Sequence, residues 1–452
     1  MSTAGISFGG LASGLDTKAI ISALVALEER PIRAMETKKA SYTKQKSMFS
    51  DLRGLLDKLS TSAKALKTST DFLKMKAASS DEEVLTASAS TSATPGTYTV
   101  TVNSLAKAQV KASTGSSSAT AVVGTGELVI NVKGLDHVIT PGGDNLTDIA
   151  TAINAYDDAN EIGVRAEVVD TGNTANGGAQ RYQLVVRATE PGTENAFTIS
   201  GDAGLATLMS QIQGNTITAA TDTSLTVNGI NVTRSTNQVA DVFPGITLDL
   251  KKAGTATITV STDSEEIGKK VQEFVDAYNK VVDFFTDQNA LDAEGKAKSP
   301  LFGDSTLRSM RGALRTVLGG AVDTSGNPAY QMLSQLGIKS DTAGKLTFDK
   351  TKFDEALAAD EDAVAAVFTD ATKGIAVKMF DQLDLYTDSV EGLLKSRSDT
   401  FDRQVKDTQS RIDQAERRLT LYEKQLEAKY ANLESLLSRL QSQGSSVNSI
   451  GR

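Results

Sequence analysis

Few residues in this chain of 452 could support catalysis or metal binding. The sequence has no cysteine and one histidine, His137, so thiolate nucleophiles, disulfides and multi-histidine metal sites are excluded. Asp136, Asp144 and Asp148 lie near His137 but lack the D-x-D-x-D-G spacing of a calcium loop. They stand among turn residues, which favours roles in turns and helix caps. We therefore predict that His137 is structural and that the chain uses no metal or cofactor.

Sequence motifs of common enzymes are also missing. The chain has no Walker A motif, no G-x-S-x-G and no H-E-x-x-H. The glycine-containing run Gly9–Gly14 does not open a βαβ unit, so it is a weak candidate for a phosphate-binding loop. No feature of the sequence indicates an enzyme, and we predict no catalytic residues.

The charge and hydropathy of the chain narrow its possible partners. The formal net charge is −9, which disfavours nucleic acid. Arg33–Lys76 is basic, with a net charge of +7, but lacks interleaved aromatic residues; we interpret it as the solvated face of a helix opposite an acidic partner. No segment approaches the roughly 20 apolar residues of a membrane helix. Met1–Gly10 lacks the basic and apolar regions of a cleaved secretion signal, so we expect a cytosolic protein or export by another route.

Seven-residue repeats mark the N-terminal part of the chain as helical. Pro31 marks an early boundary, because proline disfavours helix at the preceding residue and suits the first turn of a helix. Beyond it, two rows of positions recur every seven residues, the second row three residues after the first. The first row contains Met35, Tyr42, Phe49, Leu56 and Ala63, and the second contains Lys38, Gln45, Leu52, Leu59, Leu66 and Leu73. This pattern predicts a heptad helix that is polar at its start and apolar later.

The C-terminal part repeats the pattern more regularly. Leu393 to Gln443 contains no glycine or proline, which predicts a helix about 75 Å long. The first heptad row of this helix, from Val405 to Leu440, is apolar throughout. Its second row is less apolar and contains Thr408, Ala415, Tyr422, Lys429 and Leu436, so we interpret the helix as one member of a mixed bundle. The residues predicted to pack the helices and mediate assembly are Phe49, Leu52, Leu56, Leu59, Leu66, Val405, Ile412, Leu419, Leu426, Leu433 and Leu440.

Between the two ends, apolar and polar residues alternate, which predicts strands. The predicted strands are Thr97–Val102, Glu127–Val132, Tyr182–Arg187, Leu225–Val232, Ile246–Leu250 and Ala256–Val260. We expect one short helix, Asn145–Tyr156, to interrupt them, and helical spacing returns at Ser264.

These patterns predict an α+β multidomain fold, in which both chain ends form a helical coiled-coil or bundle stalk that encloses nested β-rich head domains. The predicted parts are a flexible N-terminal leg (1–40), the N-terminal and C-terminal parts of the stalk (41–76 and 263–392), a β-rich head (77–118 with 221–262), an inserted variable β-rich head (119–220) and a C-terminal coiled-coil leg (393–452).

Four stretches, in one consistent order, carry a family resemblance. They are Gly10–Thr17, Leu225–Leu248 leading into Phe274–Asn279, Leu301–Arg308, and Leu336–Asp349. In these stretches the chain resembles the flagellar hook-associated protein 2 family, the caps of flagellar filaments. Glu127–Ser200 also looks like a β-rich insert shared by several flagellar axial proteins.

The resemblance implies a ring of subunits, often five, at the distal tip of the bacterial flagellar filament, where the cap shelters exported flagellin while it folds. The implied partners are further copies of the chain, flagellin, hook–filament junction proteins and an export chaperone, with no nucleic acid and no membrane insertion. The implied location is extracellular, after type III export, which agrees with the missing cysteine. Two alternatives remain: a tip adhesin that binds host glycans, and another flagellar axial protein such as a junction protein.

Overall fold

The computed structural model describes residues 16–322 and 329–450, with the side chains of Asn176 and residues 445–450 outside that description. It confirms the predicted α+β class. The described residues up to Phe72 and those from Glu265 onward form one compact unit, and Leu73–Ser264 forms the other. We call them the helical unit and the β unit. The N- and C-terminal parts of the sequence thus fold together, with the β unit inserted between them in the chain.

The helical unit contains nine helices and one small hairpin within the described residues. They are α1 (Thr17–Glu28), α2 (Arg30–Lys64), α3 (Ser69–Phe72), α6 (Ser264–Gln288), α7 (Ser305–Gly319), the hairpin of β16 (Ile338–Ser340) and β17 (Leu346–Phe348), α8 (Lys350–Ala359), α9 (Glu361–Thr369), α10 (Ile375–Thr387) and α11 (Leu393–Ile450).

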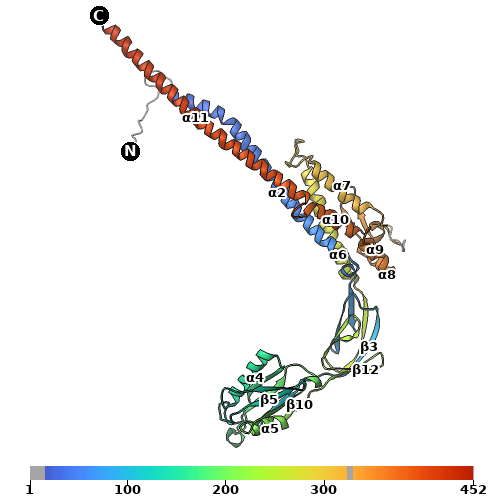
Figure 1. The fold of residues 1–452 in the computed structure, drawn as a ribbon. Helices are drawn as coiled ribbons and strands as arrows, with labels where there is room; N and C mark the ends of the chain where they lie inside the picture. Colours follow the sequence, from blue (N-terminus) through green and yellow to red (C-terminus); the bar gives the residue numbers. More distant parts are fainter. Residues whose placement is uncertain (1–15, 323–328, 451–452) are drawn as a thin grey trace. The chain divides into compact units, whose positions relative to one another are not determined.

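The starts of α1 and α2 carry sequence signals of a helix N-terminus, and α11 starts where the sequence predicts. Pro31 occupies the first turn of α2, and the side chain of Asp16 caps α1 by accepting a hydrogen bond from the Ala19 amide at 2.9 Å. The predicted C-terminal helix is confirmed: α11 starts at Leu393 and has 58 residues, a length of about 87 Å. α2 lies alongside α11 (Figure 1).

The predicted heptad rows of α2 form its buried face. Phe49, Leu52, Leu56, Leu59, Ala63 and Leu66 are all buried, against α10 and α11. Full burial of one such large apolar side chain is worth about 1.5–3 kcal/mol. The face is therefore the principal reason for α2 to remain helical, since a solitary helix in water is marginal.

The first part of the β unit is built from antiparallel strands. Five of them form a sheet in the order β1 (Met75–Ser79), β15 (Gly254–Thr262), β3 (Gly96–Ser104), β11 (Thr223–Val227), β12 (Ile230–Arg234), and three form a sheet in the order β13 (Gln238–Phe243), β14 (Ile246–Leu250), β2 (Leu85–Ala89). Alternate residues such as Val100, Val102, Ala256, Ile258 and Val260 face a shared apolar core.

The prediction of one continuous strand over Leu225–Val232 is wrong. The segment is a hairpin of β11 and β12, and Asn228 and Gly229 turn between them with φ values of 50° and 87°. Positive φ at both central residues is the geometry of a type I′ turn, for which Asn-Gly is the preferred sequence. The Asn228 side chain adds a hydrogen bond from the Thr99 amide at 2.9 Å, which fastens the turn to β3.

The second part of the β unit contains residues of the predicted insert, 119–220, together with a strand at Val110–Ala112 that precedes the predicted boundary. Its strands form a four-stranded sheet, β10 (Thr216–Thr218), β4 (Val110–Ala112), β8 (Tyr182–Ala188), β7 (Val164–Asp170), and a three-stranded sheet, β6 (Leu135–Ile139), β5 (Leu128–Val132), β9 (Phe197–Gly201). The predicted helix is present as α4 (Leu146–Asn160). The expectation of a single helix is wrong, because α5 (Ala206–Gly214) is a second one.

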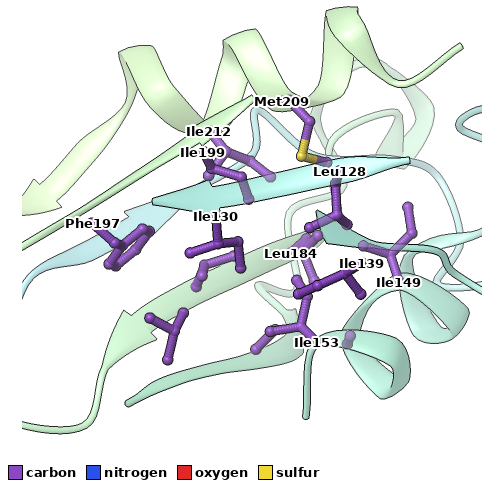
Figure 2. Packing of buried hydrophobic residues seen from close by; sticks show 14 of the residues in the cluster. Leu128, Ile130, Ile139, Ile149, Ile153, Leu184, Phe197, Ile199, Met209 and Ile212 are labelled. Carbon is purple, nitrogen blue, oxygen red and sulfur yellow. The ribbon is translucent and has the colours of Figure 1, made fainter. Parts of the chain in front are cut away.

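Helix α5 escaped prediction because it is short and carries few apolar residues. Leu208, Met209 and Ile212 are nevertheless buried, and they close one side of the insert's core. Figure 2 shows Met209 and Ile212 over Leu128 and Ile199, with Ile149 and Ile153 of α4 on the other side. Both helices are therefore part of a single apolar core.

Leu56→Ala tests the burial of the α2 face. The substitution should lower the free energy of unfolding of the helical unit by about 2–5 kcal/mol, because it leaves a cavity at a fully buried site. The β unit, which has its own cores, should keep its stability. Hydrogen–deuterium exchange followed by mass spectrometry through a denaturant series would report on peptides of each unit separately. Leu421→Ala, at an exposed position of α11, is the matched control and should change stability by about 0.5 kcal/mol or less. Equal destabilisation of β-unit peptides by Leu56→Ala would contradict the division into two units.

Candidate assembly surface

The surface most suited to a function in assembly is the long α2–α11 pair. The two helices are joined by a cluster of Arg397, Phe49, Phe401 and Asp304, which we call the arginine clamp. The ring centroids of Phe49 on α2 and Phe401 on α11 lie 5.7 Å apart. The Arg397 guanidinium lies over both rings, 5.4 Å from the Phe49 centroid and 5.6 Å from the Phe401 centroid. Arg397 also forms an ion pair with Asp304 at 2.7 Å. One side chain on α11 thus contacts α2 and the start of α7.

Asp304 has a second role, as the N-cap of α7. Its carboxylate accepts hydrogen bonds from the Thr306 and Leu307 amides at 2.8 and 3.1 Å. The Arg397–Asp304 pair is partly buried, with the two side chains 32% and 16% exposed, so removal of either partner would leave the other charge only partly solvated. Of the residues in the clamp, Phe49 was predicted as a packing residue, whereas Arg397 and Asp304 were not. The spacing of Arg397 and Phe401, four residues apart on one helix face, is the signal that could have indicated the clamp.

Beyond the clamp the contact between the two helices becomes polar. Lys39 bonds to Gln409 and Lys46 pairs with Asp402 across the two helices, and the Gln45 amide of α2 donates to the Pro300 carbonyl, in the segment before α7, at 3.0 Å. Thr408 is buried at a d position, and Oε1 of Gln404 is buried without a hydrogen-bond partner. Polar groups at such positions lower stability but fix the register of a helix pair. This stretch therefore sets alignment more than it adds stability.

The polar stretch is followed by a groove of about 510 Å³ between the α1–α2 junction and α11. Its apolar lining comes from Pro31, Ile32 and Met35 on one side and from Leu419 and Tyr422 on the other. Ile32 is buried, whereas Met35 and Leu419 are only half-buried. The helices are thus less tightly packed here than at the clamp.

The predicted assembly residues fall into three groups along this pair. Phe49, Leu52, Leu56, Leu59, Leu66, Ile412 and Leu426 are buried, and Val405 and Leu419 are half-buried. Leu433 and Leu440 are exposed, at 45% and 54%, and so is Leu436 in the second row, at 58%. We call Leu433, Leu436 and Leu440 the bare stripe. The structure thus brings the first two groups together across the α2–α11 pair and leaves the third uncovered by the described residues; the role of all these residues in assembly stays a prediction.

The candidate polar residues of the β unit have structural surroundings. The His137 ring packs edge-on against Tyr156, with centroids 5.9 Å apart. Asp136 accepts from the Asn131 amide group at 2.6 Å and Asp148 from that of Asn145 at 2.5 Å, while the Asp144 carbonyl accepts from the Val123 backbone at 2.8 Å. Across residues 16–322 and 329–450, no group of three or more His, Asp or Glu side chains is placed to hold a metal ion.

Several groups among the described residues have shifted pKa values, and the causes are ion pairs, hydrogen bonds in turns, and burial. The Arg181 guanidinium, with help from the Gly172 amide, lowers the pKa of Asp170 to about 2. The amides of Glu391 and Val390 lower the pKa of Asp388, which closes the turn before α11. Burial raises the pKa of Tyr278 and of Tyr386. These groups stabilise turns and cores, as expected of a scaffold. Of the described helices, none is both long and apolar enough to cross a membrane.

A chain whose ends pair into a long helical leg with a bare apolar tip belongs to the class of assembly proteins. Two family models match it: flagellar hook-associated protein 2 N-terminus over residues 13–109, and flagellar hook-associated protein 2 C-terminus over residues 220–442. The chain is 30% identical over 451 residues to the B-type flagellar hook-associated protein 2 of Pseudomonas aeruginosa, covering 93% of this chain and 92% of the relative. It is 28% identical to the flagellar hook-associated protein 2 of Escherichia coli K12, covering 98% and 97%.

A solved structure agrees with these matches. The D1–D2–D3 domains of the flagellar cap protein FliD from Escherichia coli superpose with a TM-score of 0.66 at 28% identity, over 78% of this chain and 99% of that one. The chain therefore belongs to the flagellar hook-associated protein 2 family, and the resemblance in its four stretches is confirmed.

Arg397→Lys tests the clamp. Lysine keeps the charge but loses the planar group that lies over both rings and the fork that meets Asp304. The helical unit should lose about 1–3 kcal/mol of stability in denaturant titrations. Arg403→Lys, on the exposed side of the same helix, is the matched control and should have little effect. A stability of Arg397→Lys equal to that of the control would show that the clamp contributes nothing.

Proposed function

We propose that this chain caps the distal tip of the bacterial flagellar filament. In this proposal several copies form a ring that promotes the folding and insertion of exported flagellin and prevents its loss. Its support is membership of the family over nearly the whole chain, together with the described helical leg. The work is geometric and involves no catalysis, so the chain is not an enzyme in this account.

The bare stripe is the observation that carries the mechanism. Three leucines stand exposed in the last turns of the described α11 side chains: Leu433 and Leu440 continue the row that is buried at Ile412 and Leu426, and Leu436 belongs to the second row. A row of apolar side chains in water marks a surface for a partner. The repeat that pairs α11 with α2 thus continues past the covered part of the helix, and a further helix can extend the packing there. In the proposal that partner is the N-terminal leg, a neighbouring copy or flagellin.

The proposed division of labour follows the predicted parts. Residues 1–40 and 393–452 act as legs that engage the filament, 41–76 and 263–392 form the stalk, and the β-rich heads 77–118 with 221–262 and 119–220 cover the growing end. The partners are other copies, of which five is the number that the resemblance implies, together with flagellin, hook–filament junction proteins and an export chaperone. The location is extracellular, at the filament tip.

Substitution of Leu433, Leu436 and Leu440 by serine tests the bare stripe. Because these side chains are exposed, the variant should fold and be exported at normal levels. It should fail to hold the tip, so filaments should shorten or vanish and flagellin should accumulate in the medium. Quantitative immunoblots of secreted cap and secreted flagellin, with electron microscopy of the cells, measure both effects.

Leu421→Ser provides the control, because Leu421 is an exposed leucine of α11 outside the heptad rows. It should leave filaments normal. Full-length filaments in a strain that carries only the triple serine variant would refute the role given to the stripe. Loss of the variant protein itself would instead assign the three leucines to the stability of the subunit.

A further inference from the structure

We propose that neighbouring copies in the ring contact each other head-to-tail, through a basic stripe on α7 of one copy and an acidic corner between α10 and α11 of the next. The inference rests on the proposed ring and adds the contact surfaces to it. Both surfaces belong to the helical unit, where α7 and α10 are labelled in Figure 1. The proposed occupant of each surface is thus a second copy of this chain.

The basic stripe consists of Arg308, Arg311 and Arg315. Their spacing of three and four residues places them on one face of α7. Arg308 and Arg315 are exposed, and Arg311 donates to the Ala343 carbonyl at 2.9 Å. Within the described part of the chain, none of the three forms an ion pair with an acidic side chain. The stripe therefore presents three positive charges that no acidic side chain of residues 16–322 and 329–450 pairs with.

An apolar pocket of about 300 Å³ lies at the end of this stripe. Arg315 and Leu318 line it from α7, Met332 and Ile338 line it from the following segment, and Tyr278 lines it from α6. Met332 is 46% exposed. A pocket of this size has room for one or two aliphatic side chains, with the arginine at its rim. The surface as a whole is suited to an acidic segment that carries an exposed aliphatic residue.

The acidic corner offers a segment of that composition. The chain from Met379 to Leu394 has four acidic residues and no basic one. Asp381 pairs with Lys67 at 3.2 Å, but Asp384 and Glu391 are exposed and, within the described residues, without an ion-pair partner.

Two aliphatic side chains project from the same corner. Leu385 is 66% exposed and Val390 is 79% exposed. The turn that carries Val390 is held by the Asp388 carboxylate, which accepts from the Val390 and Glu391 amides at 2.8 and 2.7 Å. A fixed turn loses little conformational entropy on binding. The corner is therefore a preformed, acidic projection with apolar tips.

The two surfaces are opposite in charge, and each also carries apolar side chains. An apolar contact surrounded by polar and charged groups is the usual anatomy of a protein interface, and opposite charges set the partner and the orientation. Because the stripe and the corner are different patches, each copy uses one toward each neighbour. Such a heterologous contact closes into a ring when its rotation allows.

Charge reversal tests the contact on the full-length chain. Arg308→Glu with Arg315→Glu should weaken self-association at least tenfold in sedimentation or light-scattering titrations. Asp384→Arg with Glu391→Arg should weaken it similarly. A chain that carries all four substitutions should regain association to within a few-fold of the original, because the charges are complementary again. Lys58→Glu with Lys280→Glu, at exposed positions of α2 and α6, is the control and should change association little.

Disulfide trapping supplies a readout of proximity, and the absence of cysteine from the sequence makes it unambiguous. A chain with both Arg308→Cys and Val390→Cys should give a ladder of covalent multimers on mild oxidation, whereas each single variant should give at most dimers. Thr316→Cys with Val390→Cys, on a different face of α7, is the matched control and should give little product.

The outcomes separate this inference from the proposed ring. Oligomers that neither respond to charge reversal nor cross-link through residues 308 and 390 would overturn the contact and leave the ring standing. A chain that forms no oligomer at any concentration would overturn both. Reversal of the α7 charges that weakens binding to flagellin without weakening self-association would assign the stripe to flagellin and also overturn the contact.

Discussion

The burial of the apolar face of α2 against the C-terminal part of the chain is the contact on which the rest of the molecule depends. Phe49, Leu52, Leu56 and Leu59 are buried, and among the described elements α2 packs mainly on α11 and α10. Lys46 and Asp402, which meet across this pair, are 356 residues apart in the chain. The entropy of closing so long a loop must be offset before the contact yields any stability. The β unit contains two apolar cores of its own, so its folding would shorten the loop that this contact has to close.

Stability is distributed unevenly along the α2–α11 pair. Near the clamp the seam is aromatic and aliphatic, and Arg397 joins it to the α7 cap. Farther along the pair, the polar side chains of Gln404 and Thr408 and the groove beside Leu419 make the packing looser. From Leu433 to Leu440, no described residue buries the apolar side chains of α11. The burial of α11 thus decreases from the clamp toward its outer end. Such a decrease suits a helical leg that is anchored in a stable subunit at one end and binds a partner at the other. The same gradient places local opening at the outer end, where few buried contacts resist it.

Much of the helical unit could be predicted from its heptads, because a period of seven directly encodes one buried face. The burial of Leu52, Leu56 and Leu59 follows from that period, whereas the start of α11 at Leu393 follows from the absence of glycine and proline between Leu393 and Gln443. The exposed end of α11 could not be predicted, since the repeat continues through Leu440 without any sign of where its partner stops. Arg397 was missed because a heptad pattern predicts a solvated side chain at its position. In the structure its planar guanidinium lies over the Phe49 and Phe401 rings. The Asn228–Gly229 turn shows the reverse case: the local signal was present but lay inside an alternating pattern that resembles one strand.

A protein that closes the growing filament must be found at its distal end. An epitope tag inserted at the exposed loop around Gly172, in the β unit, would let immunogold electron microscopy locate the full-length chain on intact filaments. A cap should give one cluster of label at the distal end of every filament, whatever its length. Label distributed along the filament, or confined to the junction with the hook, would contradict the central claim that this chain closes the growing tip.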